Sequence, residues 1–110
     1  MAKMERVLRG DFDRILQKIE EAILDTSISA SLEDASDFAE SGARCSVRVF
    51  ERYSYTGGNR VSLNVTLFEY AGVIYLSGIA SGGSQAMFWK LNTFGEEAFL
   101  DKLREAVSEF

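Results

Sequence analysis

Apolar residues recur at helical spacing near both ends of the chain. Between Asp11 and Leu24 they fall on one stripe of a helix. Asp11 is the type of residue that caps a helix start. The segment from Thr93 to Glu96 has the pattern of a capping box, which marks a second helix start. The apolar stripes of these two predicted amphipathic helices are Phe12, Ile15, Leu16, Ile19 and Ile23, and then Phe99, Leu103, Ala106 and Phe110.

Between the helices, apolar and polar residues alternate with the period of two that is typical of strands. The expected strands cover residues 3–8, 28–32, 45–55, 61–67, 73–80 and 87–91. Residues 3–8 fit a helix equally well, and the interruption at Gly10 favours the strand. Residues 33–43 are acidic and rich in serine and alanine, so we expect an exposed connection there.

Two turns predict how the strands pair. A three-residue loop at Gly57-Gly58-Asn59 places Arg48 beside Phe68. A two-residue turn at Ala71-Gly72 places Phe68 beside Tyr75. In this register the odd-numbered side chains from Cys45 to Leu67 face the helices, because apolar side chains of paired strands share a face. Cys45 is then expected to be a packed thiol.

The predicted fold class is α+β, with a single antiparallel sheet of about five strands and two amphipathic helices packed on one face. The elements follow the order strand, helix, strands, helix. The length of 110 residues suits one domain, and no linker or repeat divides residues 1–110.

Composition excludes several kinds of chemistry. The chain has no histidine and one cysteine, which excludes an intramolecular disulfide, histidine-dependent triads and zinc fingers. We therefore expect no metal and no cofactor. No apolar stretch suits a signal peptide or a membrane span, so the expected location is cytoplasmic without membrane contact. The net charge of -5 argues against a nucleic acid partner.

The sheet face away from the helices is the first candidate site. The predicted register gathers cations and aromatic rings there, and both are enriched at protein interfaces. The candidate binding residues are Arg48, Phe50, Arg52, Phe68 and Tyr75. The favoured function is a non-catalytic protein-interaction or self-association module, with a homo-oligomer, most simply a dimer, formed through this face. The alternative is a solvated face in which cross-strand pairs only support the sheet.

Aromatic residues on a sheet also suit unpaired RNA bases. The chain has no ribonucleoprotein signature, however, and the segments that flank the strands are acidic. RNA binding is therefore disfavoured.

A second candidate site is an interior pocket near Glu51 and Gly78. The predicted register turns Glu51 inward, and Gly78 leaves a gap on a neighbouring strand. A buried carboxylate is costly unless it is paired or protonated. Glu51 there could bind a small molecule or act as a general base. In the structural alternative, a bulge near Phe50 turns Glu51 outward, or an arginine or water satisfies it. No catalytic residue is assigned, which favours a protein that is not an enzyme.

Several short motifs resemble a family of small uncharacterised bacterial proteins that is classed as a domain of unknown function. The motifs are Gly10-Asp11-Phe12, Ser29 to Asp34, Glu51-Arg52-Tyr53, Thr56 to Arg60, Ser81 to Ala86 and Asn92 to Glu97. The resemblance covers nearly the whole chain. It implies no activity, substrate or site.

Overall fold

The protein is an open antiparallel sheet with helices on one face. This computed structural model describes residues 1–53, 59–82 and 89–110. Within those ranges the sheet has five strands, ordered β1-β5-β4-β3-β2, and there are two helices, α1 and α2. The elements in chain order are β1 (Ala2–Leu8), α1 (Phe12–Leu24), β2 (Ser31–Glu40), β3 (Ala43–Tyr53), β4 (Arg60–Tyr70), β5 (Val73–Gly82) and α2 (Trp89–Ala106). The predicted α+β class and the order of strands and helices are confirmed.

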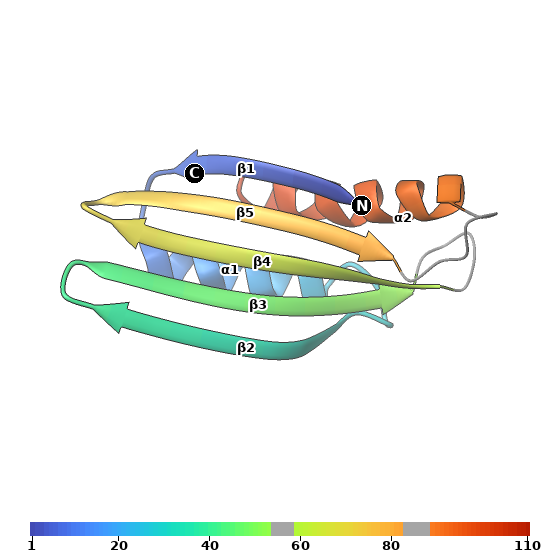
Figure 1. Ribbon diagram of the computed structural model, residues 1–110, viewed down its shortest axis with the longest axis horizontal. Coiled ribbons are helices and arrows are strands. Elements are labelled where there is room, and N and C mark those ends of the chain that lie inside the picture. Colours follow the sequence, from blue (N-terminus) through green and yellow to red (C-terminus); the bar gives the residue numbers. More distant parts are fainter. Residues whose placement is uncertain (54–58, 83–88) are drawn as a thin grey trace.

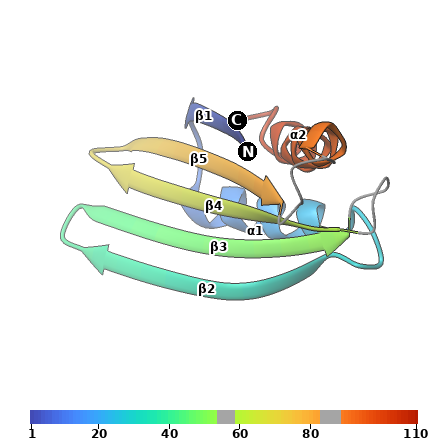
Figure 2. The same cartoon turned by 45° about the vertical axis from the view of Figure 1, so that its right-hand side comes forward.

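Both helices lie on the same face of the sheet (Figures 1 and 2). Helix α2 packs on β5, β4 and β1, and α1 lies beside α2. The stripe predicted for α1 is buried, and the Asp11 carboxylate caps its start by accepting the Arg14 N–H at 2.9 Å. The sheet contributes apolar side chains from β1, β4 and β5 to the same core. Fully buried core residues include Ile15, Ile19, Ile23, Val61, Leu63, Val65, Leu67, Phe99, Leu100 and Leu103.

The hairpin between β4 and β5 forms as predicted. Ala71 and Gly72 have φ of 54° and 78°, which is the left-handed conformation that a two-residue hairpin turn requires. Phe68 pairs with Tyr75 and Leu67 pairs with Leu76. The even positions of β5 and the odd positions of β4 therefore face the helices together.

The pairing of β3 with β4 differs from the prediction. Phe50 pairs with Leu63 and Arg48 pairs with Val65, so the even positions of β3 face the helices. The predicted neighbour of Arg48 was Phe68, which instead pairs with Cys45. Of the predicted three-residue loop, Gly57 and Gly58 lie outside the described residues. The prediction that odd-numbered side chains of this strand point inward is wrong.

The connection predicted at residues 33–43 is mostly strand β2, at the edge of the sheet. Its side chains are almost all exposed, because β2 extends past the helices (Figure 1). With both faces in solvent, β2 needs no alternation of apolar and polar residues. A bulge at Glu33 shifts its pairing with β3 between Leu32 and Asp34. Residues 28–30 lie outside any strand.

Helix α2 begins at Trp89, earlier than the predicted start at Thr93. The strand predicted at 87–91 is therefore wrong for 89–91, while 87 and 88 lie outside the described residues. Glu96 is buried, and its carboxylate accepts the N–H of Gly82 at the end of β5, at 2.9 Å. The side chain that suggested a capping box instead joins α2 to the sheet.

A candidate binding surface on the open sheet face

One row of apolar side chains crosses the open face of the sheet, away from the helices. The row consists of Val7, Tyr75, Phe68, Cys45 and Phe38, each paired with the next on the neighbouring strand. The rings of Phe68 and Tyr75 stack with centroids 6.2 Å apart. Phe38 is 67% exposed, and Tyr75 is 47% exposed. Large apolar side chains therefore meet solvent in a continuous line across the sheet.

The centre of this face carries no charge. The described open-face residues of β3, β4 and β5 are all uncharged from the turn at Ala71-Gly72 to the level of Asn64. They are Ala43, Cys45, Val47, Val49, Asn64, Thr66, Phe68, Tyr70, Val73, Tyr75, Ser77 and Ile79. The charges lie at the margins, with Lys3 and Glu5 on one edge and Asp34 and Glu40 on the other. Aromatic residues and a centre depleted of charge are the composition of an interface core.

Two shallow hollows flank Phe68 on this face. One, of about 440 Å³, has Val7, Thr66 and Tyr75 among its lining residues. The other, of about 190 Å³, has Phe38 and Cys45 in its lining. The surface therefore has relief into which a partner's side chains could fit.

Three of the five predicted binding residues lie on the opposite face. Phe50 is fully buried in the core, and Arg48 and Arg52 are 8% and 4% exposed beneath the helices. Phe68 and Tyr75 remain on the open face. The expectation that cations share that face with the rings is wrong, because β3 turns its arginines inward and presents Cys45, Val47 and Val49 outward.

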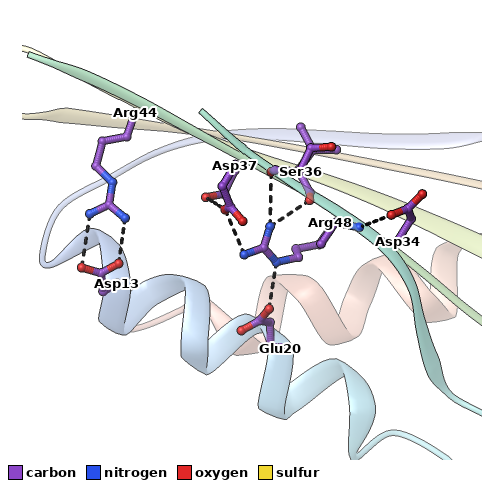
Figure 3. Close-up of polar contacts among 10 residues, drawn as sticks. Asp13, Glu20, Asp34, Ser36, Asp37, Arg44 and Arg48 are labelled. Carbon is purple, nitrogen blue, oxygen red and sulfur yellow. Dashed lines mark hydrogen bonds and ion pairs between the residues drawn. The ribbon is translucent and has the colours of Figure 1, made fainter. Parts of the chain in front are cut away.

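Arg48 ties helix α1 to the edge strand (Figure 3). Its Nε donates to Glu20 Oε2 of α1 at 2.8 Å, and its Nη2 lies 3.0 Å from Asp37 Oδ1 of β2. Its Nη1 donates to the carbonyl oxygens of Ser36 and Val47 at 3.3 and 2.9 Å. The buried guanidinium thus has both charge partners and hydrogen-bond partners, which a buried cation requires.

Hydrogen bonds in the same cluster lower the pKa of Asp37, one of the two charge partners of Arg48. The hydroxyl of Ser46 donates to Asp37 Oδ1 at 2.6 Å. This hydrogen bond, followed by the contact with Arg48, lowers the pKa of Asp37 below the ordinary value for aspartate. The carboxylate therefore stays ionised at a lower pH than an ordinary aspartate does. The cluster is a structural clamp between α1, β3 and β2.

Arg44 and Arg52 place their guanidinium groups over buried rings. Arg44 donates to Asp13 Oδ1 at 2.8 Å (Figure 3). Its guanidinium carbon lies 4.1 Å from the ring centroid of Phe12. Arg52 lies 4.4 Å from the ring centroid of Phe99. Arginine stacks on aromatic faces through cation–π attraction and apolar contact. These two arginines of β3 therefore support the packing of the helices on the sheet.

The prediction of an interior pocket near Glu51 and Gly78 is wrong. Glu51 lies on the open-face side of β3, where the Nε of Arg60 donates to its Oε1 at 2.6 Å. Gly78 faces the helices, where a Cβ atom would collide with Cδ2 of Leu103 and approach Leu100 and Met4 at 3.3 Å. The two residues are on opposite faces, and side chains fill the space below Gly78. The alternative in which an arginine satisfies Glu51 is confirmed.

Sequence reasoning missed Phe38, Val7 and the outward position of Cys45. A usable signal was Ser41-Gly42, which as a two-residue turn pairs Glu40 with Ala43 and brings Phe38 beside Cys45. The acidic, serine- and alanine-rich composition around Phe38 masks this signal, because that composition is typical of an exposed connection.

Two further properties bear on function. The described part of the chain holds no group of three or more histidine, cysteine, aspartate or glutamate residues arranged to bind a metal ion. Among the described helices, none is long and apolar enough to cross a membrane.

Comparison with known proteins assigns the chain to a family. No curated protein matches it. Residues 1–110 match the model of a family described as a family of unknown function, DUF6054. The resemblance to a domain of unknown function that the sequence motifs predicted is thereby confirmed. The chain belongs to the DUF6054 family over its whole length.

Proposed function

We propose that this protein is a non-catalytic interaction module that binds a second copy of itself through its open sheet face. The observation that carries the proposal is the uncharged, aromatic centre of a face that no described helix covers. Contiguous exposed apolar surface of this kind is uncommon on monomers and marks interaction sites. The cytoplasm is the proposed location, where the single free Cys45 would stay reduced.

The size of the face suits a stable dimer. Strand spacing and rise per residue give a five-stranded face of about 24 by 30 Å, or about 700 Å². A standard protein interface buries about 600–1,000 Å² on each partner. One face against its copy is therefore sufficient without any additional surface.

The solution mass tests the proposal. We expect sedimentation equilibrium to give the unaltered chain about twice its 12.3 kDa monomer mass. Phe68→Ser and Tyr75→Ser should each shift the mass toward the monomer, since they remove rings from the centre of the interface. Ile28→Ser is the matched control, because Ile28 is a fully exposed apolar residue outside the sheet. It should leave the mass unchanged.

Circular dichroism establishes that each variant is folded before its mass is interpreted. A parent that stays at the monomer mass at high protein concentration would contradict the proposal. So would a dimer that Phe68→Ser and Ile28→Ser affect equally.

A further inference from the structure

We propose that two copies pair face to face about a two-fold axis that runs parallel to the strands, along β4. This arrangement rests on the proposed self-association and specifies its geometry. It lays β4 on the β4 of the second copy, β5 on β3, and β1 on β2. The distribution of charge along the two edges of the sheet selects it.

Two arrangements are available to a symmetric pair of stacked sheets. A two-fold interface uses the same patch on both copies. Stacked sheets with aligned packing keep their strand directions within about 30° of each other. The axis between them therefore runs either along the strands or across them. With an axis along the strands, the strand order of one copy is reversed relative to that of the other, so β1 lies on β2. With an axis across the strands, each strand lies on the same strand of the second copy.

The two edge strands differ in the charge that they present on the open face. On β2, Asp34 and Glu40 lie on the open face, Asp37 turns toward Arg48 on the helix side, and the strand has no basic residue. On β1, Lys3 and Glu5 lie on the open face and their charges balance, while Arg6 pairs with Leu76 on the helix side. An axis across the strands lays the acidic β2 on the acidic β2 of the second copy, and like charges placed together oppose association. An axis along the strands lays β2 on β1 and avoids this repulsion.

The register makes the contact specific. One row across the open face consists of Lys3, Ile79, Asn64, Val49 and Asp34. A half-turn about an axis at Asn64 lays this row on itself in reverse. Lys3 of each copy then lies over Asp34 of the other, so the dimer contains this contact twice.

The same half-turn lays the apolar row from Val7 to Phe38 on itself in reverse. Phe68 lies over Phe68 of the second copy, Tyr75 over Cys45, and Val7 over Phe38. Every large apolar side chain of this row meets another apolar or aromatic group. Both the charged margin and the apolar centre are therefore self-complementary about one axis.

Charge reversal at the margin tests the axis. Lys3→Asp and Asp34→Lys should each weaken the dimer about tenfold, as two repulsive contacts replace two attractive ones. The double variant Lys3→Asp/Asp34→Lys should restore the parent's dissociation constant to within about threefold. The dissociation constants are measured by sedimentation at low salt, where exposed charge pairs are least screened.

Matched controls lie on α2, away from the open face. Lys102→Asp and Glu105→Lys change the net charge by the same amounts at exposed positions and should leave the dissociation constant unchanged. Asp34 also accepts the N–H of Ala35 at 2.8 Å, so thermal unfolding of each variant establishes that the edge strand is intact.

The outcomes are distinct. A dimer tightened by Asp34→Lys places the axis across the strands and overturns the arrangement. A dimer unaffected by either single variant, or a double variant that is not restored, also overturns it while leaving self-association standing. A parent that is monomeric removes the proposed function itself, and this arrangement with it.

Discussion

Single residues on β3 decide which way that strand faces. Arg48 and Arg52 occupy inward positions, and Cys45, Val47 and Val49 point outward. The pattern of the strand is thus inverted relative to the usual rule that apolar residues face the core. The inversion is possible because Glu20 and Asp37 neutralise Arg48, and because Arg52 packs over the ring of Phe99. These partners are distant in sequence, so the pattern of β3 alone could not predict them.

Asp37 makes the stability of the Arg48 clamp depend on pH. Its pKa is lowered in the folded protein, first by the hydrogen bond from Ser46 and then by Arg48. A carboxyl group whose folded pKa lies below its unfolded pKa stabilises the fold above the unfolded value. That contribution is lost as pH falls through the folded pKa.

We therefore expect Asp37→Asn to be less stable than the parent at pH 6, with a difference that shrinks toward pH 2. Urea unfolding across this range measures it. Asp25→Asn removes a carboxylate at an exposed position on the end of α1 and is the control for the change in net charge. A parent and an Asp37→Asn variant that differ equally at every pH would contradict the assignment.

At the scale of elements, the sequence predicted α1 and the β4–β5 hairpin and missed the edge strand β2. The stripe of α1 and the hairpin at Ala71-Gly72 were correct because each has an apolar face against the core. Strand β2 was missed because both of its faces meet solvent and its pairing with β3 holds it in place. The start of α2 was placed late because Glu96 bonds the sheet instead of capping its own helix.

The contact between β5 and α2 depends on Gly78. Its missing side chain lets Leu103 and Leu100 approach the strand. Gly78→Ala should lower the free energy of unfolding by about 1–3 kcal/mol, because the new methyl group overpacks a filled core. Ser77→Ala, one residue away on the open face, should change it by less than about 0.5 kcal/mol. Equal effects of the two variants in chemical denaturation would show that the contact is not tight.

At the scale of the whole molecule, the two faces of the sheet are unequal. One is covered by α1 and α2 (Figure 2). The other presents the row from Val7 to Phe38 to solvent. Phe68 and Tyr75 were placed correctly from the sequence because the β4–β5 turn fixed their register. Their neighbours on β3 were not, because the inward arginines reversed that strand. The candidate surface is therefore more apolar than the sequence predicted.

Cys45 reports directly on this face, because it is partly exposed and lies in the apolar row beside Phe68. The most direct test is the rate of Cys45 alkylation as a function of protein concentration. Self-association through the open face predicts at least a tenfold slower reaction once dimers dominate, and a fast rate independent of concentration in Phe68→Ser. An alkylation rate that stays constant while the mass doubles would place the contact elsewhere and contradict the account.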